Sequence, residues 1–139
     1  MNTPVIERVL TELDHARLSK IAGAHPTQLP DAVLEPLQDL LIDARTVPAR
    51  EVRSDIVTMY AQMQVRLNGS EALSKIALCY PDDAEPANGF VSVLSPMGLA
   101  LLGLRLGQTA QWLGPTGDTM AAQVEAILFQ PEASGDYVT

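Results

Sequence analysis

The sequence predicts an α+β protein in which a short antiparallel helical hairpin, residues 1–53, precedes an antiparallel sheet domain with one short helix, residues 54–139. Three observations predict this fold. Apolar residues recur at helical spacing over the first third of the chain, and they alternate with polar residues from Asp55 onward. A short helix with its own start and stop residues interrupts the later strands. With 139 residues, the chain is long enough to bury a core without a disulfide.

The hairpin, a short coiled coil, is predicted from two amphipathic segments. Apolar residues within positions 6–21 lie mostly three and four apart, Gly23 is the expected stop, and residues 25–30 form the expected turn. The second helix is expected to start at Asp31. Helices of this length reach only about 20 Å at about 1.5 Å per residue. The hairpin either packs on the domain behind it or projects as a docking arm.

The sheet is predicted from a change of period. Beyond Asp55, apolar residues recur at every second position, and Asn68-Gly69 is a strong hairpin signal. The expected strands cover residues 57–65, 76–80, 90–94, 109–113 and 121–129. Tight turns between these segments favour antiparallel pairing.

The inserted short helix carries its own start and stop signals. Ser95 is suited to cap its first N–H groups, and Pro96 to occupy its first position. Gly103 supplies the left-handed residue that ends it. Because no Gly-x-Ser-x-Gly pattern surrounds Ser95, this motif predicts a structural start and no nucleophile.

Composition excludes several classes of function. No apolar run reaches the about 18 residues of a membrane span, and the N-terminus lacks the pattern of a signal peptide. The single cysteine, Cys79, excludes an internal disulfide and is expected to be a buried structural thiol. His15 and His25 have no metal-ligand spacing. We expect a cytoplasmic monomer with no metal, no cofactor and no catalytic residue.

Charge indicates the kind of partner. Residues 1–53 carry a net charge of −2 and residues 54–139 a net charge of −6, with only three basic residues in the larger part. Such a surface repels a phosphate backbone, so direct nucleic-acid binding is not expected. A protein partner with a basic surface fits better.

One pair of carboxylates has the spacing of two ligands on one face of a helix. Asp31 and Glu35 lie one helical turn apart at the start of the second helix. They either hold a Mg²⁺ whose remaining ligands come from another molecule, or simply complement the helix dipole.

The run Val93-Leu94-Ser95-Pro96-Met97-Gly98-Leu99-Ala100-Leu101-Leu102-Gly103-Leu104-Arg105-Leu106-Gly107 resembles the C-terminal domain of the bacterial Gre transcription factor superfamily. Residues 55–59, 100–105 and 130–137 are similar to its short-armed branch, the regulators of nucleoside diphosphate kinase. The resemblance implies an FKBP-like fold for residues 54–139. It also implies docking at the rim of the secondary channel of RNA polymerase, by a loop that grips a polymerase coiled coil.

The resemblance assigns that docking surface to Ser95, Pro96 and Met97, flanked by an acidic loop. The acids of this loop are Asp82, Asp83 and Glu85. Alternatively, Ser95 and Pro96 only start a helix and the acids are only solvated.

Gre factors carry two acids at the tip of a long coil for transcript cleavage, but residues 24–30 here contain no acid. The arm-tip acids Asp31 and Glu35 follow on a short arm, so polymerase binding without cleavage is expected and the chain is not expected to be an enzyme. The alternatives are an FKBP-like prolyl isomerase, for which the six aromatic residues are few, and a direct modulator of nucleoside diphosphate kinase.

Overall fold

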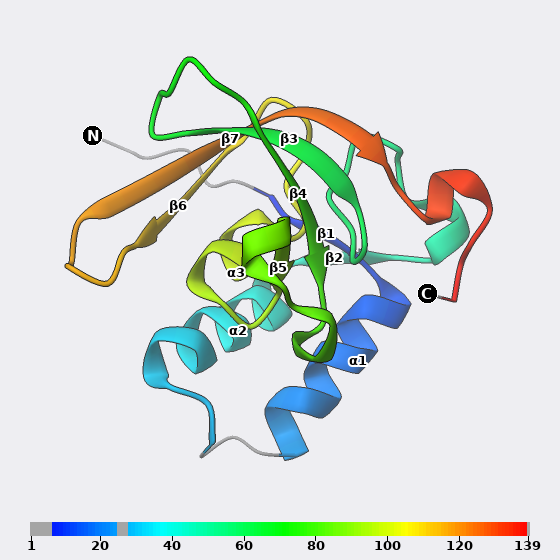
Figure 1. Cartoon of the computed structure of the whole chain (residues 1–139). Helices are drawn as coiled ribbons and strands as arrows, with labels where there is room; N and C mark the ends of the chain where they lie inside the picture. The colour runs from blue at the N-terminus through cyan, green and yellow to red at the C-terminus, as the bar shows by residue number, and fades with distance from the viewer. Residues whose placement is uncertain (1–6, 25–27, 139) are drawn as a thin grey trace.

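The computed structural model describes residues 7–24 and 28–138 as helices beneath a curled sheet (Figure 1). Its elements, in chain order, are β1 (Val9–Thr11), α1 (Glu12–Ala24), α2 (Asp31–Asp43), β2 (Arg45–Val47), β3 (Gln62–Leu67), β4 (Ser74–Cys79), β5 (Phe90–Ser92), α3 (Pro96–Leu101), β6 (Thr109–Leu113) and β7 (Thr119–Phe129). None of the described helices is long and apolar enough to cross a membrane.

The first helix begins later than its apolar period predicts. Val9–Thr11 forms the parallel strand β1 with β2, and α1 begins only at Glu12. Thr11 fixes this start because its Oγ1 accepts a hydrogen bond from the Asp14 N–H at 3.1 Å. The predicted stop at Gly23 lies one residue before Ala24, the last residue of α1. The predicted start of α2 at Asp31 is confirmed, whereas residues 25–27 of the predicted turn lie outside the described residues.

The sheet has five strands in the order β5-β4-β3-β7-β6. Its pairs are antiparallel except for β4 and β5, which run parallel. The prediction of a wholly antiparallel sheet was therefore wrong at this edge. The acidic loop, residues 81–89, carries the chain back before β5 begins, so β5 runs in the direction of β4.

The predicted first strand starts five residues late, at Gln62, because the preceding residues form a turn. Ala61 N–H donates to the Thr58 carbonyl at 3.1 Å, and Tyr60 adopts a positive φ of 64°. The apolar positions of the predicted alternation, Val57, Met59, Ala61, Met63 and Val65, are all buried. Thr58 between them is buried as well, so the alternation fails at that position.

The helices share one hydrophobic core with the sheet. Leu18 of α1 and Leu37 of α2 belong to the same buried cluster as Met63 of β3 and Leu99 of α3. Burial of such side chains stabilises the fold by about 1.5–3 kcal/mol each. The apolar faces of α1 and α2 therefore pack on the sheet domain, as the first of the two alternatives for the hairpin requires.

Candidate functional site

The start of α3 is built as the sequence predicts. Ser95 Oγ accepts the Gly98 N–H at 3.0 Å and donates to the Ser92 carbonyl at 2.7 Å, and Pro96 occupies the first helical position. Gly98 lies so close to β5 that a Cβ there would collide with the Ser92 carbonyl. The Ser95 hydroxyl thus makes one donated and one accepted hydrogen bond within the fold. The side chains of Pro96 and Met97 beside it are half-buried.

The end of α3 depends on a residue that the sequence did not single out. Arg8 Nη1 donates to the carbonyls of Ala100 and Leu102 at 2.7 and 2.8 Å. Helix C-termini leave carbonyls unpaired, and a cation there complements the helix dipole. Burial lowers the pKa of Arg8. No local pattern pointed to this contact, because its partners lie over ninety residues away in the chain.

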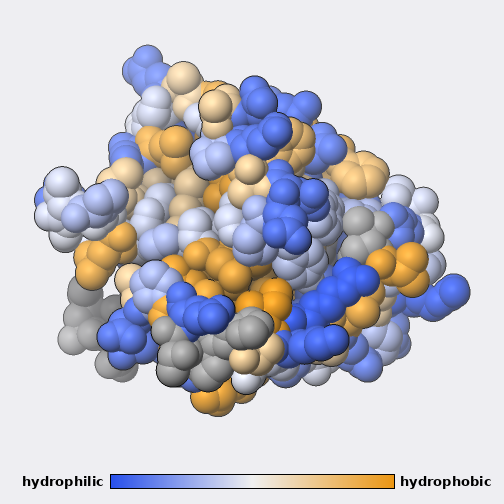
Figure 2. All heavy atoms as spheres, turned by 60° about the horizontal axis from the view of Figure 1, so that its bottom comes forward, coloured by the Kyte–Doolittle hydropathy of each residue, from blue (hydrophilic) through white to orange (hydrophobic). Residues whose placement is uncertain are grey.

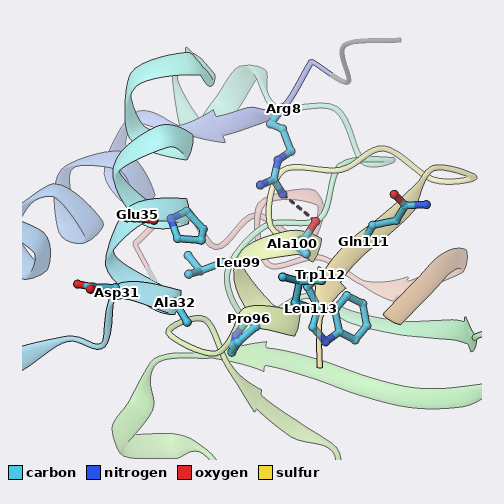
Figure 3. Close-up of a pocket in the computed structure, with 11 residues that line it drawn as sticks. Arg8, Asp31, Ala32, Glu35, Pro96, Leu99, Ala100, Gln111, Trp112 and Leu113 are labelled. Carbon is cyan, nitrogen blue, oxygen red and sulfur yellow. Dashed lines mark hydrogen bonds between the residues drawn. The ribbon is translucent and has the colours of Figure 1, made fainter. Parts of the chain in front are cut away.

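A pocket of about 350 Å³ lies between α2, α3 and β6 (Figure 3). Asp31 and Glu35 lie on its α2 wall, Pro96 on α3 and Trp112 on β6. We call it the tryptophan pocket. The predicted arm-tip acids and the predicted docking proline, far apart in sequence, thus line one hollow. Both carboxylates belong to exposed residues.

The predicted acidic loop contributes to a different pocket, of about 780 Å³, which we call the tyrosine pocket. Asp82 and Asp83 line it in a 3-10 turn, opposite residues of α1, while Leu94 forms part of its surface. Glu85 is not among its lining residues, and its carboxylate accepts a hydrogen bond from Asn88 at 3.2 Å. Of the six predicted docking residues, Pro96 lines the tryptophan pocket and Asp82 and Asp83 line the tyrosine pocket. Ser95, Met97 and Glu85 line neither of the two.

Two tyrosines shape the tyrosine pocket. The Tyr60 hydroxyl donates to Asp83 Oδ2 at 2.6 Å, and the rings of Tyr60 and Tyr80 lie 5.9 Å apart. Burial, and next the hydrogen bond to Asp83, raise the pKa of Tyr60 to about 12. Burial, and next the charge of Asp14, raise the pKa of Tyr80 to about 12. Both tyrosines are therefore neutral at physiological pH.

Asp14 is a buried acid that the sequence did not single out. It is 1% exposed, and its Oδ2 accepts the Met59 N–H at 3.3 Å. Burial, the largest cause, raises its pKa to about 6, and the nearby Glu132 adds to the rise. Its position three residues after Thr11 is a capping-box spacing, which was the available signal. Asp14 joins α1 to the turn that carries Tyr60.

The remaining candidate residues have structural surroundings. Cys79 is buried, as predicted, and burial raises the pKa of its thiol. The His15 ring contacts the Leu41 carbonyl at 2.8 Å, between α1 and α2, whereas His25 lies outside the described residues. Within residues 7–24 and 28–138, no group of three or more His, Cys, Asp or Glu is placed to hold a metal ion.

Comparisons with known proteins agree with this architecture. Residues 52–129 match the family described as "Transcription elongation factor, GreA/GreB, C-term". The regulator of nucleoside diphosphate kinase of Escherichia coli (strain K12) is 31% identical over 138 residues, which cover 99% of each chain. GreA of Solidesulfovibrio magneticus is 39% identical over 64 residues, 46% of this chain and 39% of that protein.

A solved structure of similar shape covers most of the chain. The prokaryotic transcription elongation factor GreA/GreB from Nitrosomonas europaea superposes with a TM-score of 0.72 and 26% identity, over 88% of this chain and 100% of that one. These proteins are named as regulators and transcription factors. The chain therefore belongs to the Gre transcription elongation factor family, on the branch of the regulators of nucleoside diphosphate kinase.

Proposed function

We propose that this protein is a regulator that binds RNA polymerase at the rim of its secondary channel and does not stimulate transcript cleavage. Family membership supports the partner. The packing of α2 beside α3 carries the rest of the proposal, because it puts Asp31 and Glu35 in the same pocket as Pro96. The carboxylates of Asp31 and Glu35 lie beside the docking loop and do not extend past it. A Gre-type acid must extend well past the docking surface to meet a distant metal ion.

The docking surface consists of Pro96 and Met97 with the acidic loop beside them. The two half-buried apolar side chains supply a small anchor, and Asp82, Asp83 and Glu85 supply a negative field. Such a field accelerates encounter with a basic protein helix and makes the association rate sensitive to salt. Ser95 contributes by holding the loop in shape.

The same proposal covers the finer architecture and cellular setting. Residues 1–53 act as a helical hairpin, and residues 54–139 as an FKBP-like docking domain in a cytoplasmic monomer. Any influence on nucleoside diphosphate kinase is exerted through transcription. An assay with purified kinase then shows no change of activity when the protein is added, and a proline-isomerisation assay shows no acceleration.

Binding to core RNA polymerase tests the proposal. We expect the wild type to bind at micromolar concentration and to compete with GreA, and Pro96→Asn to weaken binding about tenfold because it removes an apolar anchor. Pro115→Asn, at an exposed proline of the β6–β7 turn, is the matched control and binds normally. Asp31→Ala also binds normally, since its carboxylate is not part of the anchor.

Two results would contradict different parts of the proposal. A wild-type protein that fails to bind core polymerase refutes the partner. Normal binding by a folded Pro96→Asn variant, with its circular dichroism unchanged, refutes the docking loop alone. Stimulated cleavage of a stalled transcript would refute the absence of cleavage activity.

A further inference from the structure

The two long helices are held on the domain to different degrees. α1 buries one apolar side chain, that of Leu18, whereas α2 buries three. Figure 2 brings the helices forward, and hydrophilic residues surround the apolar ones on this face. Because apolar burial stabilises in proportion to the area removed from water, α1 depends more than α2 on polar contacts to stay in place.

Some of these polar contacts come from the other end of the chain. Beyond β7, Gln130 is 4% exposed, and its Nε2 donates to two carbonyls within residues 53–56 at 2.8 and 2.9 Å. Residues 132–138, at the red end of the chain in Figure 1, then turn back toward α1. There Arg17 donates to the Val138 carbonyl at 2.9 Å. We call residues 132–138 the strap.

The strap is firmly held where it begins and lightly held where it ends. Pro131 before it is buried, whereas residues 133–136 are exposed. At its end, Arg50 Cζ lies 4.7 Å from the centroid of the Tyr137 ring, and the hydrogen bond from Arg17 is exposed to solvent. Segments with few buried contacts open locally while the rest of a protein stays folded. The end of the strap can therefore leave α1 without unfolding the sheet.

Two carboxyls meet where the strap begins. The Met59 N–H donates to Asp14 Oδ2 at 3.3 Å, and the Thr58 hydroxyl donates to Glu132 Oε1 at 2.7 Å. Two consecutive residues thus hold one acid from α1 and one acid from the strap. Burial raises the pKa of Asp14, and the charge of Glu132 adds to the rise.

The other titratable groups around this pair do not cancel its charge. Arg17, on the same helix, favours the ionised form of Asp14, but it also donates to the strap at Val138. Tyr80, whose pKa burial and the charge of Asp14 raise to about 12, is neutral at physiological pH. Two nearby carboxylates that share one cation repel each other when both are ionised.

We propose that residues 132–138 are a strap that holds α1 on the sheet domain, and that it holds α1 more firmly when the carboxyl pair of Asp14 and Glu132 carries a proton. In the closed strap the two carboxyls lie near each other, so the closed form binds a proton more tightly than the open form. Protonation therefore favours closure by linkage. Acidification tightens the strap, and a rise of pH through about 6 loosens it.

Hydrogen exchange of the α1 amides, followed by mass spectrometry, tests whether the strap holds the helix. We expect Arg17→Gln to lower the protection of residues 12–24 about fivefold, because the end of the strap loses its contact, while β3 stays protected. Lys20→Gln removes the same charge from an exposed lysine of the same helix and is the matched control. It should exchange like the wild type.

The proton dependence has its own variant. With intrinsic exchange rates corrected for, the protection of α1 in the wild type should fall about threefold between pH 5 and pH 7.5. Glu132→Gln keeps an oxygen that accepts from Thr58 but carries no charge, so it should lose most of this fall. Glu71→Gln, at an exposed acid between β3 and β4, is the control and should keep it.

Three results would overturn the inference. If Arg17→Gln exchanges like Lys20→Gln, the strap does not hold α1. If β3 and β7 lose protection together with α1, the effect is global and no local strap exists. If Glu132→Gln keeps the full pH dependence of the wild type, the carboxyl pair does not control the strap. Every contact of the strap lies within this chain, so none of these results depends on binding to polymerase.

Discussion

The segment around α3 and the junction between α1 and Tyr60 both contain buried polar contacts, but they differ in where the partners come from and what they cost. At the start of α3, Ser95 and Gly98 bind neighbours within a few residues, and both are in favourable conformations. At the junction, Asp14 reaches the distant Met59 N–H, its carboxyl is buried, and Tyr60 is in an unfavourable conformation.

This difference distinguishes a segment that stabilises the fold from a segment that lowers its stability. A segment that satisfies its own groups is a rigid scaffold, and a natural sequence keeps it because it stabilises the protein. A region that retains a buried acid and a strained aromatic residue lowers stability, and such costs are typical of functional sites. The tyrosine pocket lies at the costly junction, and the docking loop lies on the scaffold.

The scaffold is most sensitive at Gly98. We expect Gly98→Ala to lower the free energy of unfolding by about 3 kcal/mol, because the new Cβ meets the Ser92 backbone, which cannot give way without moving β5. Urea unfolding followed by circular dichroism measures the change.

Gly23→Ala is the control for this prediction. Gly23 lies inside α1 with open space around it, so alanine there should raise stability by up to about 1 kcal/mol. A Gly98→Ala variant as stable as the wild type would mean that α3 and the Ser92 backbone pack less closely than the structure shows.

At the junction, a substitution that removes the buried charge should raise the free energy of unfolding. The rise in the pKa of Asp14 from 3.8 to about 6 corresponds to a cost of about 3 kcal/mol for the charged form at neutral pH. Asparagine removes this cost, but its amide N–H groups need acceptor partners of their own. We therefore expect Asp14→Asn to raise the free energy of unfolding at pH 7 by less, about 2 kcal/mol.

The pH dependence gives this prediction a second readout. Asp14 holds its proton more tightly in the folded protein, so its own contribution to stability falls as the pH rises from about 4 to about 6. Asp14→Asn should lack this loss, in denaturant titrations at several pH values. Glu12→Gln, at an exposed acid in the same turn of α1, should keep it. If the pH profile of Asp14→Asn runs parallel to that of the wild type, the burial of the acid is contradicted.

The smallest effect concerns the hydrogen bond that steadies the strained ring. Tyr60→Phe removes the donor to Asp83, and we expect a loss of stability of at most about 1 kcal/mol because the bond is exposed. Tyr60 is also expected to ionise more readily in Asp83→Asn, since that carboxylate raises its pKa. Absorbance titration of tyrosinate checks this, and an unchanged titration would remove Asp83 as a cause.

Local signals carried much of the prediction. The capped start at Ser95, the strand at residues 109–113 and the start of α2 at Asp31 each depend on neighbours in sequence, and each is confirmed. The alternation that predicted residues 57–65 as one strand was right about the burial of its apolar residues, but it was wrong about Thr58, which is buried, and about the conformation. Burial follows from side-chain polarity, whereas the turn at Tyr60 depends on contacts with Leu78 and Asp83, which lie elsewhere in the chain.

The sequence by itself determined the α+β class, the short helix with its cap, the acidic surface and the family resemblance, because each is written in composition or in spacings of a few residues. Only the tertiary structure decided the parallel edge pair β4–β5, the Arg8 contact at the end of α3, and the placing of Pro96 in one pocket and of Asp82 and Asp83 in another. These features join segments far apart in the chain. Their free energy comes from long-range packing and burial, which no local pattern records.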